Sequence, residues 1–265
     1  MSSLFKVIFN RCIRLVGNLV KVVSYLFHFL LPYCRFTIPA NSPAKIASHC
    51  DTSIPRIIWQ TNYSNRCALP IYVNYLFNRL MSLEYEYRYV STQEREVFMR
   101  DHAPQEVYKA YLRLNDGAAQ ADLWRVTCLY LHGGVYMDID AVLVWPLGKT
   151  LKYDDDALYI KFKKDYSEFT NYFLATVPKN PDYHAILSKI VYNINHHSEL
   201  VNKRVYDTTG PSAFNEVLQG KSVNAKKRGH VCIQGAFTNE YFQYLDKPRG
   251  KWTYLRDDEV VKKSS

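Results

Sequence analysis

Residues 121–140 read ADLWRVTCLYLHGGVYMDID, and this stretch decides the fold. The surrounding pattern predicts a helix over Ala118–Leu131. Gly133 and Gly134 end that helix, because glycine adopts the backbone angles that a helix C-terminus needs. Residues Val135–Val144 are rich in β-branched side chains and predict a strand. A helix that a tight turn joins to an apolar strand is a building unit of a sheet with helices packed on its faces.

From residue 54 onward the chain continues this alternation of strands and helices. Such a sheet is mainly parallel, and its ligand site lies where the strands end at their carboxyl edge. The sequence therefore predicts the α/β fold class. The other strands are expected over Ile54–Gln60, Tyr85–Val90, Leu158–Phe162 and Phe173–Val177, and the other helices over residues 68–82, 92–100, 104–114, 181–196 and 211–218.

Asp138 and Asp140 carry the clearest chemical signal. On one continuous strand they share a face, because strand side chains alternate. Two carboxylates so placed repel each other unless a cation lies between them, and their hard oxygen atoms suit Mg²⁺ or Mn²⁺. Asp122 and Arg125 are three residues apart and share one face of the preceding helix. A metal, a carboxylate and a guanidinium together are what a nucleotide-sugar diphosphate requires.

An Asp-x-Asp pair is common in solvated turns, so the pair alone does not indicate a function. The residues around it have to distinguish the possible functions. A phosphohydrolase of the haloacid-dehalogenase type is the enzymatic alternative, because it also uses D-x-D-x-[TV], with Asp138 as the phosphorylated nucleophile. That motif normally opens its domain, whereas some 130 residues precede it here. The A-D-x-x-R element, thirteen to sixteen residues upstream, has no role in such an enzyme.

The run A-D-x-W-R-x-x-x-L-Y-x-x-G-G-x-Y-x-D-x-D closely resembles the DXD-containing sugar transferases. These are grouped with fungal initiating α-1,6-mannosyltransferases and bacterial capsular polysaccharide synthesis proteins, and large clostridial glucosylating toxins share the same core. Residues 54–61, 171–175 and 209–214 resemble further blocks of that family. The resemblance covers about residues 52–252 and is specific to the family but not to a sugar.

This resemblance implies a GT-A fold, which is a Rossmann-like domain, and transfer of a hexose from a UDP- or GDP-sugar with retention at the anomeric carbon. Mn²⁺ or Mg²⁺ is the implied cofactor. Asp138 would contact the ribose and reach the metal through water, and Asp140 would bind the metal and the diphosphate. Asp122 would hold hydroxyl groups of the donor sugar, and Arg125 would contact the sugar or a phosphate.

The same resemblance implies further donor contacts elsewhere in the chain. Trp59 and Gln60 on the first strand would border the base, and Tyr136, Gly210 and Trp252 complete the implied donor-binding residues. Relatives often carry a histidine before a terminal G-[ST]-W, but here residues 246–252 read DKPRGKW. Asp246 is therefore the candidate for an acidic contact to the metal, and Lys251 for neutralising the leaving phosphate.

The net charge of +9 is concentrated at the N-terminus. Residues 1–50 hold six bases and no acid, so the remaining body carries a surplus of only three positive charges. This argues against a nucleic-acid partner, which needs positive charge spread over a binding face. At 100° per residue, residues 4–31 form an amphipathic helix with a wide apolar side. The polar side of that helix gathers Lys6, Asn10, Arg14, Gly17, Lys21, Ser24 and His28.

Such a helix is typical of an anionic membrane surface, with the bases meeting phosphate headgroups; the alternative is a helix packed on the body through its apolar side. The expected organisation is a membrane-associating helix over 1–35, a linker over 36–51 and the glycosyltransferase domain over 52–265. The expected acceptor is a glycan or lipid-linked saccharide in surface polysaccharide biosynthesis. We expect peripheral attachment to the cytoplasmic face of a bacterial inner membrane, in preference to a Golgi membrane. A non-catalytic membrane scaffold would leave the carboxylates unexplained.

Overall fold

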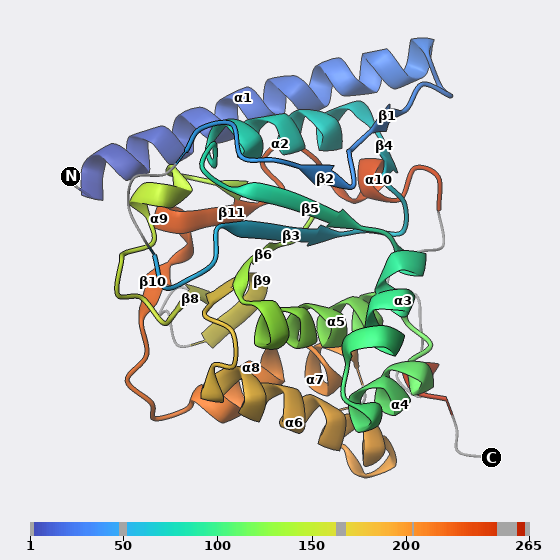
Figure 1. Cartoon of the computed structure of the whole chain (residues 1–265). Helices are drawn as coiled ribbons and strands as arrows, with labels where there is room; N and C mark the ends of the chain where they lie inside the picture. The colour runs from blue at the N-terminus through green and yellow to red at the C-terminus, as the bar shows by residue number, and fades with distance from the viewer. Residues whose placement is uncertain (1–2, 48–51, 163–167, 203, 248–258, 263–265) are drawn as a thin grey trace.

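The computed structural model describes residues 3–47, 52–162, 168–202, 204–247 and 259–262. A seven-stranded sheet forms the centre of the molecule, with helices on both of its sides (Figure 1). In order across the sheet the strands are β10 (Ala225–Lys227), β8 (Ala157–Phe162), β9 (Glu168–Thr176), β6 (Gly134–Met137), β3 (Ile57–Thr61), β5 (Glu86–Val90) and β2 (Asn41–Ser42).

Five of these strands run in the same direction, and only β9 and β2 oppose them. The predicted α/β class with a mostly parallel sheet is therefore confirmed. Parallel neighbours need long crossovers, which helices supply here. The helices of eight residues or more are α1 (Ser3–Leu30), α2 (Leu69–Leu80), α3 (Thr92–His102), α4 (Gln105–Arg113), α5 (Gly117–His132), α6 (Pro181–Asn195) and α8 (Pro211–Leu218).

Short elements complete the described chain. They are the helices α7 (Val205–Thr208), α9 (Arg228–Val231) and α10 (Glu240–Gln243), the 3₁₀ turns Leu147–Lys149 and His197–Glu199, and the strand pairs β1 (Phe36–Thr37) with β4 (Arg66–Cys67) and β7 (Ala141–Leu143) with β11 (Cys232–Gln234). Two strands, β1 and β2, lie in the predicted linker of 36–51. β1 pairs with β4, and β2 pairs with β5 at the edge of the central sheet. The chain that follows α1 is therefore built into the fold over these residues.

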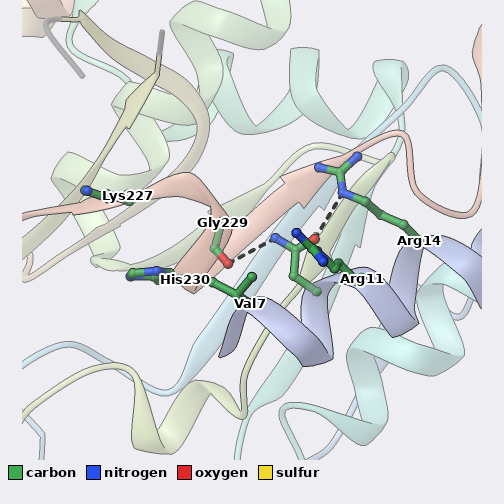
Figure 2. Close-up of a pocket in the computed structure, with 7 residues that line it drawn as sticks. Val7, Arg11, Arg14, Lys227, Gly229 and His230 are labelled. Atoms are coloured by element: carbon green, nitrogen blue, oxygen red, sulfur yellow. Dashed lines mark hydrogen bonds between the residues drawn. The ribbon is translucent and has the colours of Figure 1, made fainter. Parts of the chain in front are cut away.

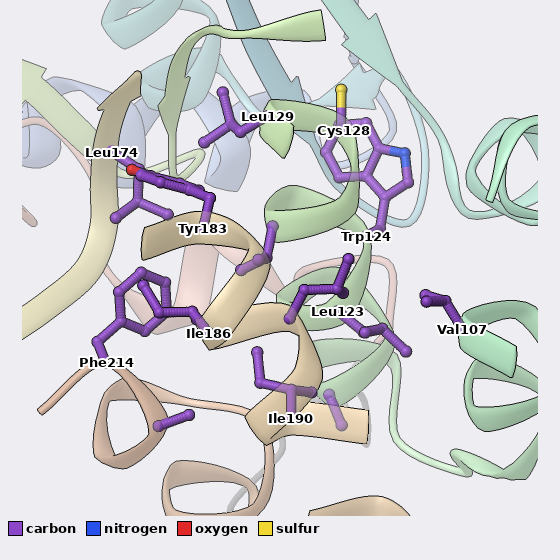
Figure 3. Packing of buried hydrophobic residues seen from close by; sticks show 14 of the residues in the cluster. Val107, Leu123, Trp124, Cys128, Leu129, Leu174, Tyr183, Ile186, Ile190 and Phe214 are labelled. Atoms are coloured by element: carbon purple, nitrogen blue, oxygen red, sulfur yellow. The ribbon is translucent and has the colours of Figure 1, made fainter. Parts of the chain in front are cut away.

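Alternation along the strands divides the interior into two main cores. Trp59 and Tyr136 point to one side of the sheet, while Ile58 and Val135 point to the other. The side chains of α5, α6 and α8 fill the first core (Figure 3). Its fully buried members include Leu123, Trp124 and Leu129 of α5, Ile186 and Ile190 of α6, and Phe214 of α8. Helix α2 covers the opposite face of the sheet.

The polar side of α1 is packed against the body, which reverses both expectations for this helix. Ser24 and His28 are buried, and His28 accepts a hydrogen bond from the amide of Leu69 at 3.1 Å. Lys21 donates to the carbonyl of Gly235 at 3.3 Å. The side chain of Asn10 donates to the carbonyl of Gly229 at 3.1 Å (Figure 2). Most of the polar arc therefore contacts protein, and α1 lies across α2 and α9 (Figure 1).

The apolar side of α1 faces away from the body. Leu15, Leu19 and Phe29 are 73%, 65% and 81% exposed, and the same face continues through further large apolar side chains. Monomeric soluble proteins rarely expose a continuous apolar surface of this kind. Residues Phe5–Leu30 are also long enough and apolar enough to cross a membrane, judged by length and composition alone.

Candidate functional site

The Asp-x-Asp motif lies on a turn between two strands. β6 ends at Met137 and β7 begins at Ala141 in a different sheet, so the single strand predicted over Val135–Val144 is wrong. The amide of Ala141 donates to the carbonyl of Asp138 at 3.0 Å, which closes the turn. The β-branched residues favour a strand on both sides of the motif, but the hydrogen bond that closes the turn interrupts the strand at the two aspartates.

Three neighbouring elements hold this turn in place. Asp138 donates its amide to the carbonyl of Tyr172 on β9 at 2.9 Å. From β3, Gln60 donates its side-chain amide to the carbonyl of Asp138 at 3.0 Å, and from α2, Asn74 donates to the carbonyl of Ile139 at 2.9 Å. Gln60 is itself fixed by the hydroxyl of Tyr87 at 3.1 Å. Gln60 therefore positions the motif through its backbone.

The two carboxylates converge on one amide group. Nε2 of Gln234, at the end of β11, lies 3.2 Å from a carboxylate oxygen of Asp138 and 3.2 Å from one of Asp140. Burial, and then the charge of Asp138, raises the pKa of Asp140 to about 6, although hydrogen bonds from Gln234 and Gln243 act in the opposite direction. The pair thus keeps an excess of negative charge that one neutral amide does not remove.

This arrangement fits a divalent cation. The carboxylate oxygens of Asp138 and Asp140 are hard ligands that face a common point, and their mutual repulsion falls when a cation lies between them. Within the described ranges no group of three His, Cys, Asp or Glu side chains comes together. Water and ligand phosphates would therefore complete the coordination, as is usual for Mg²⁺.

Arg125 links the helix α5 to this turn. Its Nη1 lies 3.2 Å from Oδ1 of Asp138 and donates to the carbonyl of Asn171 at 2.9 Å, while Nη2 lies 3.1 Å from Oδ1 of Asp122. The guanidinium also lies over the ring of Tyr136, 4.3 Å from its centroid. Burial opposes the charged form, but Asp138, Tyr136 and Asp122 raise the pKa of Arg125 above its ordinary value.

Asp122 is buried behind Arg125 and accepts from two further side chains. Nδ2 of Asn171 and Oγ1 of Thr209 each lie 3.0 Å from one of its oxygens. Burial raises the pKa of Asp122 to about 7, while Arg125 acts to lower it. Gly210 follows Thr209, and a Cβ on Gly210 would lie 2.8 Å from the carbonyl of Tyr206. The glycine thus permits the close chain path that brings Thr209 to Asp122.

Tyr136 and Trp59 lie beneath the site, inside the core. The hydroxyl of Tyr136 donates to Oδ1 of Asp138 at 2.7 Å, so this buried side chain orients the carboxylate. Trp59 is only 5% exposed, and its indole nitrogen donates to the carbonyl of Gly133 at 3.0 Å. Its ring therefore supports the turn between α5 and β6. The resemblance had implied that Trp59 borders the base, but the buried ring is not presented to one.

The predicted residues near the C-terminus lie apart from this cluster or outside the described chain. Asp246 pairs with Arg35, with Nε of the arginine 2.7 Å from the carboxylate, and the structure does not bring it to Asp138 and Asp140. Gly250, Lys251 and Trp252 lie outside the described residues. The predicted set is thus brought together as Asp122, Arg125, Asp138 and Asp140, with Gln60, Tyr136 and Gly210 supporting it.

Sequence reasoning assigned no role to several residues that complete the site. Asn171 and Thr209 stood inside recognised segments, but their hydrogen bonds to Asp122 were not foreseen. Gln234 lies 94 residues after Asp140, and no spacing or motif links the two. Burial and the nearby Asp116, Asp138 and Asp140 carboxylates raise the pKa of Tyr244 to about 12. The hydroxyl of this tyrosine therefore keeps its proton.

Comparison with known proteins shows that this site is similar to that of known glycosyltransferases. A family model described as the glycosyltransferase sugar-binding region containing the DXD motif matches residues 70–158. An uncharacterized glycosyltransferase, L373 of Acanthamoeba polyphaga mimivirus, is 21% identical over 196 residues, which cover 73% of this chain and 76% of the relative. These matches favour a glycosyltransferase over the phosphohydrolase and scaffold alternatives.

The fold is shared with a solved glycosyltransferase structure. The PaToxG glycosyltransferase superposes with a TM-score of 0.50 at 16% identity, over 82% of this chain and 79% of that one. The UDP-bound glycosyltransferase domain of the YGT toxin reaches a TM-score of 0.40 at 14% identity, over 62% of this chain and 56% of that one. The chain thus has the GT-A fold, and its Asp-x-Asp region is similar to the glycosyltransferase sugar-binding region containing the DXD motif.

Proposed function

We propose that this glycosyltransferase moves a hexose from a UDP- or GDP-sugar to a glycan or lipid-linked saccharide, with Mn²⁺ or Mg²⁺ and with retention at the anomeric carbon. The observation that carries the proposal is the convergence of Asp138 and Asp140 on one amide of Gln234. Two half-buried carboxylates with excess negative charge, and an arginine beside them, match the charge pattern of a metal-bound diphosphate.

Asp138 and Asp140 would hold the cation. When bound, a divalent cation neutralises the negative charge that develops on the leaving diphosphate. Arg125 adds a fixed positive charge beside the same point, and its position needs no rearrangement because Asp122 and the carbonyl of Asn171 already hold it.

Asp122 would orient the donor sugar. A carboxylate offers about four acceptor positions, and three are used here by Asn171, Thr209 and Arg125. One position therefore remains for a sugar hydroxyl. A retaining transfer of this kind needs no strong enzymic base, because the departing phosphate can take the proton of the acceptor. No carboxylate of the site then has to take the proton of the acceptor.

The outward face of α1 supports a membrane setting for the acceptor. We propose that this face enters the acyl-chain region while the catalytic body stays in water, as in peripheral proteins held by an interfacial helix. The polar side of α1 is bound to the body along its length, which favours a helix lying in the membrane plane. Cys12, Cys34, Cys67, Cys128 and Cys232 are free thiols, which favours the cytoplasmic face. Surface polysaccharide biosynthesis is the proposed process.

Donor binding can be tested without knowing the acceptor. We expect UDP or GDP to raise the melting temperature of the full chain only when Mn²⁺ or Mg²⁺ is present, and Asp140→Asn to abolish that rise. Hydrolysis of a panel of UDP- and GDP-sugars would then identify the donor. Nucleotide stabilisation that is equal in EDTA, or that survives in Asp140→Asn, would contradict the proposed metal role.

Membrane attachment has its own test. Leu15→Gln with Leu19→Gln removes apolar side chains from the outward face of α1, and we expect at least a tenfold loss of flotation with vesicles. Leu76→Gln with Leu80→Gln is the matched control, since these leucines of α2 are 49% and 64% exposed. Equal loss in both pairs would count against the outward face as the membrane contact.

A further inference from the structure

The side chain of Gln234 lies at the point where the two motif carboxylates meet. Its Nε2 is 3.2 Å from Oδ2 of Asp138 and 3.2 Å from Oδ1 of Asp140. An amide nitrogen carries two N–H groups, so this one side chain donates to both carboxylates. In the metal-free protein the amide is therefore in contact with both of the groups that would hold the cation.

The backbone of Gln234 is fixed beside the motif, whereas its side chain is exposed. β11 pairs with β7 in an antiparallel arrangement that sets Gln234 opposite Ala141. The amide of Gly235 donates to the carbonyl of Asp140 at 3.1 Å, and the carbonyl of Gly235 accepts from Lys21 of α1 at 3.3 Å. The chain thus holds Gln234 next to the carboxylates, while the exposed terminal amide can rotate without displacing packed neighbours.

A cation at this point reverses which end of the amide is favoured. The N–H groups of Gln234 stabilise two bare carboxylates, but they would repel a cation that the same carboxylates bind. The carbonyl oxygen of an amide is instead a hard, neutral ligand of the kind that suits Mg²⁺ and Mn²⁺. The last torsion of a glutamine side chain is roughly two-fold, so half a turn exchanges Nε2 and Oε1.

We propose that Gln234 is a third protein ligand of the cation: its Nε2 bridges Asp138 and Asp140 in the metal-free protein, and its Oε1 ligates the cation once it is bound. The amide then takes a coordination position otherwise left to water. Two carboxylates balance the charge of a divalent cation, and a neutral ligand keeps that balance, whereas a third carboxylate would repel the diphosphate. This assignment rests on the proposed function, because it needs the cation that the two aspartates would hold.

The number of water molecules on bound Mn²⁺ tests the assignment. Full-length protein is loaded with Mn²⁺ and with whichever of UDP or GDP stabilises the natural protein, and the waters are counted from the broadening of the Mn²⁺ electron paramagnetic resonance lines in ¹⁷O-enriched water. Gln234→Met keeps the length of the side chain but offers only a soft thioether, so we expect one additional water. Gln234→Glu keeps an oxygen ligand and should show the same number of waters as the natural protein.

Gln93→Met is the matched control, because Gln93 is an exposed glutamine of α3, and it should leave the water count unchanged. Equal counts in the natural protein and in Gln234→Met would overturn the assignment, and tighter Mn²⁺ binding by that variant would then show that the amide only competes with the cation.

Asp140→Asn separates this outcome from failure of the proposed function. The variant should lose Mn²⁺ whether or not Gln234 is a ligand, because it removes a carboxylate that would hold the cation. Mn²⁺ binding that Asp140→Asn abolishes, together with equal water counts in the natural protein and Gln234→Met, would overturn the role of Gln234 alone. A natural protein that binds no Mn²⁺ would overturn the proposed metal dependence and this assignment with it.

Discussion

Nη1 of Arg125 lies 3.2 Å from Oδ1 of Asp138, so one buried guanidinium joins helix α5 to the turn of the Asp-x-Asp motif. The same group holds Asp122 and the carbonyl of Asn171. The distance between helix, sheet and turn is thereby set before any ligand arrives. Preorganised charge of this kind costs no rearrangement when a substrate develops charge beside it.

Arg125→Met should be strongly destabilising. Removing one partner of a buried ion pair leaves an uncompensated charge, here on Asp122 and Asp138, at a cost of about 3–5 kcal/mol. Urea denaturation would measure this loss. Arg125→Lys keeps a charge, but its three N–H donors lie on one nitrogen and cannot span Asp122, Asp138 and the carbonyl of Asn171 as the guanidinium does. This variant should fold while losing most donor hydrolysis. Arg100→Met, which removes an exposed arginine from α3, should leave stability unchanged. A similar effect of both methionine variants would contradict the structural role of Arg125.

The negative charge of Asp140 should destabilise the metal-free protein. Because its pKa is raised to about 6, protonated Asp140 contributes stability that is present below about pH 4 and lost as the pH rises through 6. Asp140→Asn should therefore match the natural protein at pH 4 in EDTA. At pH 7.5 it should melt higher, by about 2–4 °C for each 1 kcal/mol of relieved repulsion.

Metal should reverse the order of the melting temperatures of Asp140→Asn and the natural protein. With Mn²⁺ and the preferred nucleotide, the natural protein should gain melting temperature and Asp140→Asn should not. Asp154→Asn, at an exposed loop carboxylate, should show neither the pH-dependent gain nor the loss of metal response. A melting-temperature difference for Asp140→Asn that is independent of pH would show that burial and the charge of Asp138 do not destabilise the ionised carboxylate of Asp140.

The limits of prediction are visible in particular elements. The helix over Ala118–Leu131 could be predicted because a long apolar pattern and two glycines mark it, and the structure extends it by only one residue at each end. The turn at Asp138–Asp140 could not, since its hydrogen bonds come from Gln60, Asn74 and Tyr172, which are distant in sequence. Periodicity also found two sides of α1. It could not tell which side the body covers, because that depends on carbonyl groups of the body.

A substitution of Trp59 can distinguish a structural role in the core from contact with the nucleotide base. Trp59→Phe keeps the apolar ring but removes the hydrogen bond to the carbonyl of Gly133, so we expect a loss of about 1–3 kcal/mol in the free energy of unfolding. The ratio of KM values for UDP- and GDP-sugars should not change, because the ring is not presented to solvent. Unfolding in urea and donor kinetics measure the two effects separately. A changed ratio with unchanged stability would instead place Trp59 at the base.

Gly17 should control the docking of α1. A Cβ at this position would overlap the carbonyl of Ala236, whereas Asn18 is exposed on the next position of the helix. Gly17→Leu should therefore lift α1 from the body, and Asn18→Leu should not. Leucine favours helix at both positions, so any difference reports docking and not helix formation.

Limited trypsin digestion measures this directly, because Lys21 donates to the carbonyl of Gly235 only while α1 is docked. We expect cleavage after Lys21 to accelerate at least tenfold in Gly17→Leu and to stay near the natural rate in Asn18→Leu. The core built from α5, α6 and α8 does not touch Gly17, so the main unfolding transition should be retained. Equal cleavage rates in the two variants would mean that the contact between Gly17 and Ala236 does not hold the helix in place.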